Sequence, residues 1–379
     1  MTVRSGVVGI WVIATGVLIA ILYFGRSIFA PFALAVFLFL IMEGFARVID
    51  NKLRVPGPYL NRAIAILTVL AGFGLFFGLL AQGVAQFGEQ ASDYEQKINA
   101  LISDIYAVMR MDQAPTLTEI IFNDTGQRFF ATIANATGDL SGDLVVILIY
   151  VAFLFLAQSA WSPKLDYIFP VTERREQVRD IGQAARRGIE TYLWTQTVIS
   201  ALITVLTYFT LLVLGVSNTL FLAGLIFVLN YIPTIGSIVA ALVPTLFALV
   251  QPDLPAWVPG EGDNDSYFFA IFVFAGVSFW QFAIGNFVQP RIMGETLNLS
   301  ALVVLLSLAI WGALWGIPGM FLSAPLTVLL MILFAQSTST RWIAVLLSAD
   351  GKPGGLVAGA VNDDLVITAE SAEDEPWQN

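Results

Sequence analysis

The chain has 379 residues, of which 57% are hydrophobic and 12% are charged, and its net charge is −10. Soluble domains carry about 25% charged residues, so the composition predicts an all-α, polytopic membrane protein without a large soluble catalytic domain. The negative charge argues against nucleic acid as a partner. The absence of cysteine and histidine excludes thiol nucleophiles, Cys/His zinc sites and histidine triads, so no enzymatic activity, metal or cofactor is expected.

Residues 1–81 predict three transmembrane helices. The first apolar run, residues 7–24, is followed by Gly25-Arg26-Ser27, which we interpret as a tight turn. Residues 28–42 then run back as a second, short span. A polar loop leads to a third span at residues 63–81, whose glycines allow close helix packing.

Residues 82–142 form a predicted extracytoplasmic, amphipathic helical region. Apolar residues recur at steps of three or four from Val84 to Met109, which is the spacing of one helical face. Thr116 followed by Glu119 predicts the capped start of a second helix. The region is either a helical hairpin packed on its own protein, or an oligomer contact or interfacial helix.

Residues 143–190 contain a predicted fourth span at 144–158 and a basic amphipathic segment at 161–190. The preference of Lys and Arg for the cytoplasmic side places that segment inside. Residues 191–341 form the predicted transport core, which begins with a fifth span at 191–214. Residues 342–379 are predicted to be an acidic, cytoplasmic tail.

Two long uncharged runs in the core are each interrupted. Residues 220–250 are broken at Asn230-Tyr231-Ile232-Pro233-Thr234-Ile235-Gly236, and residues 301–334 at Gly316-Ile317-Pro318-Gly319. Proline removes a backbone donor and clashes with the preceding turn, so we interpret each run as two half-length helices. Broken helices at membrane depth need protein or a water-filled cavity around the break, and they indicate a transporter's binding site.

A sixth span at residues 267–288 separates the two broken runs. When both termini are placed in the cytoplasm and the broken runs fold back as re-entrant hairpins, most Lys and Arg residues lie inside. The chain then has about six full spans and two hairpins, or about eight hydrophobic segments, in two span-plus-hairpin units of opposite orientation. Full crossing of the membrane by a broken run is the alternative topology.

Three blocks of the core carry a resemblance. They are residues 229–236 (LNYIPTIG), residues 289–294 (QPRIMG), and residues 315–320 (WGIPGM) with 324–326 (APL). In order and spacing they resemble the autoinducer-2 exporter family of membrane transporters. The resemblance implies a multi-spanning bacterial inner-membrane protein, and a homo-oligomer is expected because some members are oligomeric. It also implies export of a small furanosyl signal or, as in other members, cation/proton exchange.

The candidate pathway residues lie at or near the two breaks. Freed carbonyls and half-helix ends could bind cations, hydroxyls or anionic groups, whereas simple kinks and interhelical hydrogen bonds are the structural alternatives. Arg291 is either a positive-inside anchor or part of a gate-closing ion pair with Glu295. The full set is Asn230, Pro233, Thr234, Gly236, Gln281, Asn286, Gln289, Pro290, Arg291, Gly294, Gly316, Pro318, Gly319 and Pro325.

These features predict a secondary transporter or exporter of a small polar solute, whose partners are the solute, the lipid bilayer and further copies of the chain. The apolar spans contain no Asp or Glu, and only Glu43, Asp143 and Glu190 lie at their edges, which disfavours a proton-coupled antiporter. That sodium/proton-type antiporter and a non-transporting membrane scaffold are the alternative functions. No nucleotide-binding motif occurs, so any coupling is to gradients.

Overall fold

The computed structural model describes residues 2–53, 58–111, 114–122, 144–259, 265–293 and 298–352. In these residues the regular structure is helical, apart from one isolated bridge between Leu299 and Ser348. The described helices long and apolar enough to cross a membrane are Arg26–Gly44, Arg174–Leu214, Asp265–Ile292 and Ile317–Ala335. The all-α, polytopic membrane fold is therefore confirmed, whereas the division of the chain into five parts stays a prediction.

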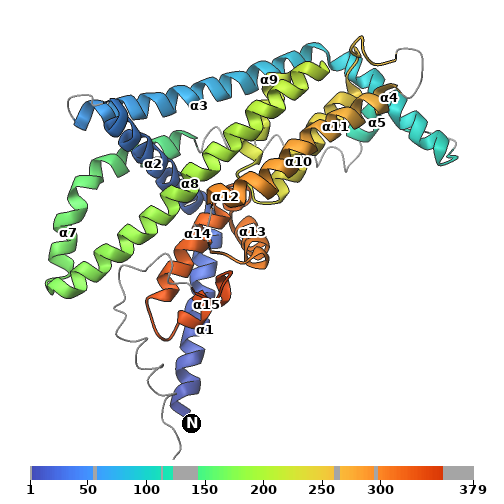
Figure 1. Ribbon diagram of the computed structural model, residues 1–379. Helices are drawn as coiled ribbons and strands as arrows, with labels where there is room; N and C mark the ends of the chain where they lie inside the picture. The colour runs from blue at the N-terminus through green and yellow to red at the C-terminus, as the bar shows by residue number, and fades with distance from the viewer. Residues whose placement is uncertain are drawn as a thin grey trace, which may run out of the picture.

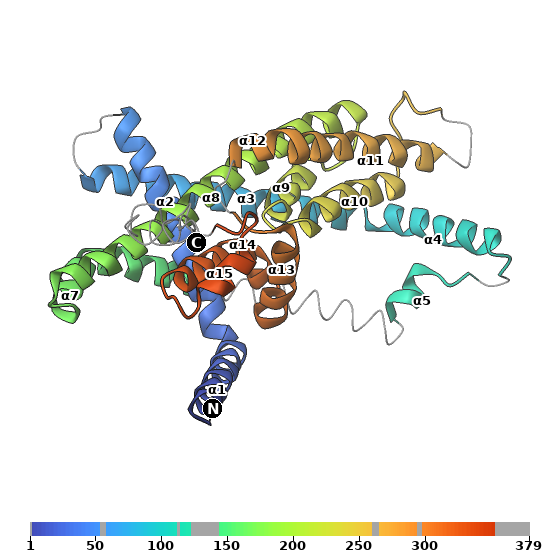
Figure 2. The same ribbon diagram turned by 60° about the horizontal axis from the view of Figure 1, so that its bottom comes forward.

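The first two helices, α1 (Thr2–Phe24) and α2 (Arg26–Leu53), meet at Gly25. The Gly25 amide donates to the Ile21 carbonyl at 2.8 Å, and the Phe29 amide donates to the Gly25 carbonyl at 2.9 Å. Figure 1 and Figure 2 show α2 leading away from α1 rather than folding back along it. The predicted tight turn is wrong, because helical hydrogen bonds continue through a bend at glycine. The cytoplasmic location of the N-terminus stays a prediction.

The region after the third span is a helical arm. α3 (Pro58–Glu89) leads through Gln90 into α4 (Ala91–Val108), and α5 (Leu117–Phe122) follows. The Thr116 amide donates to Glu119 Oε2 at 3.0 Å and the Glu119 amide donates to Thr116 Oγ1 at 3.3 Å, which confirms the predicted cap. Near its start, α4 buries Tyr94 against Phe247, whereas Val108 at its far end is exposed. α4 therefore meets its own protein at its N-terminal end and projects from it (Figure 1).

A long straight helix follows the fourth span. The helix Leu144–Ala157, the short η1 (Gln158–Ala160) and α7 (Trp161–Ile168) lead into α8 (Thr172–Leu214), which has 43 residues. The predicted basic segment and the predicted fifth span are therefore largely one helix. α8 contains no proline to break it, and it ends at Gly215, whose φ of 79° is typical of a helix C-terminus.

Both predicted breaks are present. The first separates α9 (Thr219–Leu229) from α10 (Ile235–Val250), and the second, at Gly316, separates α13 (Ala301–Trp315) from α14 (Ile317–Ala335). Between the two hairpins lie α11 (Asp265–Ala283), the π-helical η2 (Ile284–Val288) and α12 (Gln289–Met293), and α15 (Arg341–Leu347) follows them.

The two hairpins lie along α8 from opposite directions. The α14 arm of the second hairpin packs on Ala185, and the hairpin's tip packs on Tyr192 and Leu193. The tip of the first hairpin reaches Gln196, and its open end reaches Gly215. Figure 1 shows α10 and α11 beside the upper half of α8 and α14 beside its middle. The hairpin tips therefore meet near the middle of α8, in the opposed orientation expected from the sequence.

One of the four hairpin arms exceeds the predicted half-membrane length. From Gln196 to Gly215, α8 rises about 28 Å at 1.5 Å per residue, which is close to the ~30 Å thickness of the hydrocarbon core. The first hairpin covers this whole distance. α14 is also long enough to cross a membrane. The prediction of half-length arms therefore holds for α9, α10 and α13, which are too short to be membrane-crossing helices, and is wrong for α14.

Candidate functional site

An aromatic contact joins the two helix breaks. Tyr231 of the first break stacks on Phe321 near the start of α14, with ring centroids 4.8 Å apart and ring planes at 21°. Phe37 of α2 packs edge-on against Phe321, with centroids 5.3 Å apart. Tyr231 is buried. Residues far apart in sequence meet here, so the two breaks lie next to each other in the fold.

Asn230 connects three elements beside this contact. Gln196 of α8 donates from Nε2 to the Asn230 backbone carbonyl at 2.6 Å, and Gln281 of α11 donates from Nε2 to Asn230 Oδ1 at 3.1 Å. Asn230 is 8% exposed, and its Nδ2 has no hydrogen-bond partner among the described residues. A buried unpaired donor costs about 1–3 kcal/mol. Asn230 Nδ2 is therefore an unpaired buried donor beside the contact between the two breaks.

The hydroxyl groups of Thr197 and Tyr231 form a directed pair. Thr197 Oγ1 donates to the Leu193 carbonyl at 2.7 Å, and it lies 2.7 Å from the Tyr231 hydroxyl. Because Thr197 has one hydroxyl proton, Tyr231 is the donor between the two. The phenol is thereby held against α8, in the orientation in which its ring stacks on Phe321.

A glycine on the second arm of each hairpin allows the arms to approach closely. A Cβ at Gly236 would collide with the backbone carbonyl of Leu229, and a Cβ at Gly319 with that of Trp311. Both glycines lie just after a break, where the second arm passes the backbone of the first. The predicted importance of these two positions thus has a steric reason that is common to both hairpins.

The backbone at the breaks is unusual at Thr234 and Gly316. Thr234 has φ of 62° and ψ of −58°, and Gly316 has φ of 66° and ψ of −140°. A non-glycine residue in such a region costs about 1–3 kcal/mol, and such strain gathers at ligand sites and switches. Pro318 lies in the first turn of α14, where proline is tolerated, so Gly316 rather than Pro318 makes the second break. Pro325 is buried inside α14 without interrupting it.

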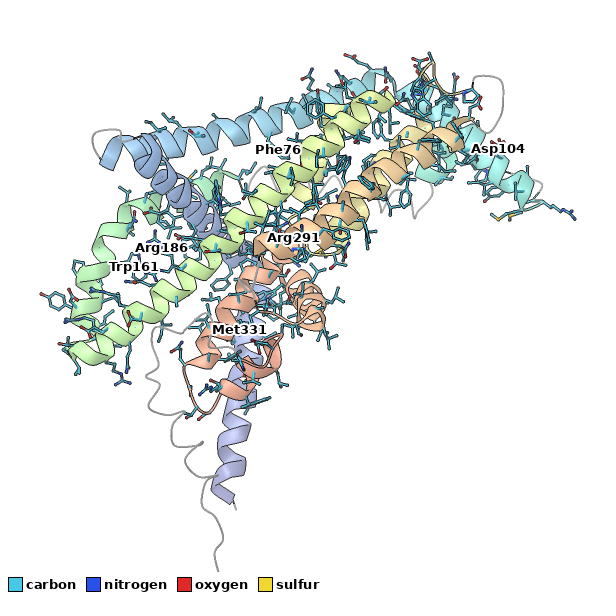
Figure 3. The ribbon with its side chains drawn as sticks, in the orientation of Figure 1. Phe76, Asp104, Trp161, Arg186, Arg291 and Met331 are labelled. Carbon is cyan, nitrogen blue, oxygen red and sulfur yellow. The ribbon has the colours of Figure 1, made fainter. Side chains whose placement is uncertain are left out.

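The other sequence candidates lie on or after η2. Asn286 is exposed and donates to the Phe282 carbonyl of its own helix at 2.9 Å. Pro290 and Arg291 are exposed on α12, which begins at Gln289, and Figure 3 shows Arg291 where α12 meets α8. Gly294 and the proposed partner Glu295 lie outside the described residues. Of the predicted amides, the structure therefore brings Asn230 and Gln281 together.

Sequence reasoning missed four members of the site. They are Gln196, Thr197, Tyr231 and Phe321. Gln196 could have been found, because an amide within a predicted apolar span needs a partner. Tyr231 and Phe321 give no such signal, because aromatic residues are common in every span of this chain.

Comparison with known proteins connects this geometry to a family. A family model described as "AI-2E family transporter" matches residues 12–339. A "Putative transport protein" of Haemophilus influenzae is 30% identical over 353 residues, covering 90% of this chain and 94% of that protein. The "AI-2 transport protein TqsA" of Escherichia coli K12 is 28% identical over 348 residues, covering 89% of this chain and 95% of that protein. The family match contains α8 and both hairpins, and the chain belongs to the AI-2E family of transporters.

Proposed function

We propose that the protein is a secondary transporter that exports a small, uncharged, hydroxylated solute of the autoinducer-2 kind across the bacterial inner membrane. The meeting of the two hairpin tips at Tyr231 and Phe321 carries the proposal. The polar groups described beside it are amides and hydroxyls of Gln196, Thr197, Asn230, Tyr231 and Gln281. Neutral donors and acceptors beside aromatic rings suit a neutral, hydroxyl-bearing ligand. The name of the TqsA relative is consistent with that class of solute.

The stacked rings act as a gate between the two hairpins. In the closed contact, Tyr231 is fixed by Thr197 of α8, and Phe321 is backed by Phe37 of α2. Separation of the tips would expose the Asn230 amide cluster to one side of the membrane at a time. This is alternating access by movement of one repeat against the other around a fixed site.

The function is tested by comparing exported metabolites. A deletion strain and its complemented form are analysed by untargeted mass spectrometry of the medium, and extracellular autoinducer-2 is measured in parallel. A neutral, hydroxylated compound is expected to fall in the deletion strain and to return on complementation. Identical media from the two strains, with the protein expressed in the complemented one, would contradict an export function.

The amide cluster provides a matched pair of variants. Gln281→Leu removes the hydrogen bond to Asn230 and is expected to lower export about 3–10-fold, because a lost hydrogen bond is worth about 0.5–1.5 kcal/mol. Asn286→Leu removes an amide that bonds to its own helix, and it should leave export unchanged. Efflux of autoinducer-2 from cells expressing each variant at equal level is the measurement. If both substitutions lowered export equally, the hydrogen bonds of Asn230 would have no special role in transport.

The proposed orientation places the basic segment and the C-terminus in the cytoplasm. Because the chain has no cysteine, a single introduced thiol reports one position. Arg175→Cys and Lys352→Cys are expected to react only with a reagent that enters the cell, and Asp253→Cys with an impermeant reagent from outside. Reaction of the cysteine at position 352 with the impermeant reagent would show that the C-terminus is outside, and that the second hairpin has the opposite orientation to the one proposed.

A further inference from the structure

Three hydroxyl groups on α8 are buried without a hydrogen-bond partner. Ser200 Oγ, Thr204 Oγ1 and Thr207 Oγ1 bond to no other group among the residues that the structure describes. Ser200 and Thr207 are completely buried. All three lie within residues 196–215 of α8, whose length matches the ~30 Å hydrocarbon core. Lipid tails offer no hydrogen bond in place of a protein partner, so unpaired hydroxyls at this depth require an explanation.

Three neighbouring hydroxyl groups show the usual arrangement in a helix. Thr197 and Thr210 of α8 donate to the carbonyls four residues earlier, at 2.7 and 2.9 Å. Thr245 of α10 does the same at 2.8 Å. This bond to the helix's own backbone is open to Ser and Thr at any interior position. The three unpaired hydroxyls do not make it, so they are available to a group outside α8.

The unpaired hydroxyls continue the polar cluster at the first break. Counted from Gln196, they follow at steps of four, four and three residues, and a helix with 3.6 residues per turn places such positions on one face. Gln196 donates to the Asn230 carbonyl, and Asn230 Nδ2 is itself unpaired among the described residues. The next hydroxyl along α8, that of Thr210, is bonded and accepts from Trp280 Nε1 at 2.8 Å. Unpaired polar groups therefore extend about 16 Å along α8, from the first break towards the open end of the first hairpin.

The surroundings of these hydroxyls are apolar. Ile199 and Ile203 of α8 belong to one buried cluster with Ile226 of α9, Ala240 of α10 and Ile284 of η2. Figure 1 shows α10 and α11 along the same part of α8. Sites for small molecules combine apolar walls with a few placed polar groups. In addition, η2 is a π-helical turn, a distortion that occurs frequently at functional sites. The setting is therefore that of a ligand path as well as of a helix interface.

We propose that Ser200, Thr204 and Thr207 form a hydroxyl track, along which the solute passes between the amide cluster at Asn230 and the open end of the first hairpin. The proposal rests on the proposed function, because it gives the path of the same neutral, hydroxyl-bearing solute. Each hydroxyl of the track can donate one hydrogen bond and accept two, as can each hydroxyl of the solute. When the first hairpin moves away from α8, the solute makes the hydrogen bonds that the closed protein leaves unmade.

Water access to the hydroxyl track is tested without any solute. Because the chain has no cysteine, Ser200→Cys and Thr207→Cys each introduce a single thiol, and the full-length protein in lipid nanodiscs is treated with a small, charged thiosulfonate. Both thiols are expected to react at least about tenfold faster than that of Ala35→Cys, because a two-state protein visits its open state even without ligand. Ala35 is as completely buried, but it lies in an apolar cluster of α2. The increase in mass of the intact protein measures the reaction, and rates no higher than that of Ala35→Cys would overturn the proposal.

Isosteric variants test whether the solute uses the track. Ser200→Ala and Thr207→Val remove unpaired hydroxyls, so the midpoint of thermal unfolding should stay the same or rise. Autoinducer-2 efflux at equal expression is expected to fall about 3–10-fold in each, the effect of losing one hydrogen bond. Thr245→Val removes a hydroxyl that bonds to its own helix, and it should leave efflux unchanged.

The two measurements separate failure of the track from failure of the proposed function. Parental efflux from both Ser200→Ala and Thr207→Val would show that the solute does not pass along the track, even if the introduced thiols react. Unreactive thiols would overturn the track while leaving the comparison of exported metabolites unaffected. If the deletion strain instead exports normally, the proposed function fails, and the reaction of the thiols still decides whether the track opens to water.

Discussion

Gly319→Ala and Gly236→Ala are each expected to abolish export and to lower the stability of the protein. At Gly319, an added Cβ would collide with the Trp311 carbonyl and lie 3.1 Å from Trp315 Cβ. At Gly236, it would collide with the Leu229 carbonyl and lie 2.8 Å from the Leu229 carbonyl carbon. A backbone cannot rotate aside as a side chain can, so the two arms must separate. Overpacking of this kind costs about 1–3 kcal/mol or more, and separation of the arms also displaces the ring that each hairpin contributes to the gate.

Two other glycines provide matched controls. Gly182 of α8 and Gly285 of η2 have no atom within 4 Å of an added Cβ, so Gly182→Ala and Gly285→Ala should keep both stability and export. The measurements are the midpoint of thermal unfolding in detergent and autoinducer-2 efflux at equal expression. Parental values for Gly319→Ala would show that the arms of the second hairpin do not approach as closely as the structure has them.

The sequence predicted those features that local chemistry determines. Proline and glycine within uncharged runs located both breaks, and the pair Thr116 and Glu119 located a helix start that the structure confirms. The interpretation of Gly25 failed because glycine permits both a turn and a bend. The turn and the bend are distinguished by the helical hydrogen bonds of Gly25, which donates to Ile21 and accepts from Phe29.

The remaining features depend on contacts between distant segments. Tyr231 and Phe321 are ordinary apolar residues until the two hairpins place them ring to ring. Glu43 and Arg186 are far apart in the chain, and their ion pair exists because α2 packs against α8. Neither contact leaves a periodic or compositional trace, so a single sequence could suggest the site's location at the breaks but not its composition.

Linking positions 231 and 321 covalently is expected to stop export reversibly. The chain has no cysteine, so Tyr231→Cys combined with Phe321→Cys creates a unique pair at a contact whose ring centroids are 4.8 Å apart. A short, reducible thiol cross-linker should hold the two hairpin tips together. If the tips must separate in each cycle, autoinducer-2 efflux falls to the level of cells without the protein and returns when the linker is cleaved.

A second cysteine pair is the control for the effect of cross-linking itself. Gly312 and Met320 lie on the two arms of the second hairpin, and the Met320 side chain comes within 3.0 Å of a Cβ built at Gly312. Because the arms of one hairpin move together in the proposed cycle, linking Gly312→Cys to Met320→Cys should leave export unchanged. Each single variant, treated with the same reagent, shows the effect of modification alone. Normal efflux with positions 231 and 321 linked would mean that the tips stay together during transport, and the solute would then have to pass outside the contact between the two breaks.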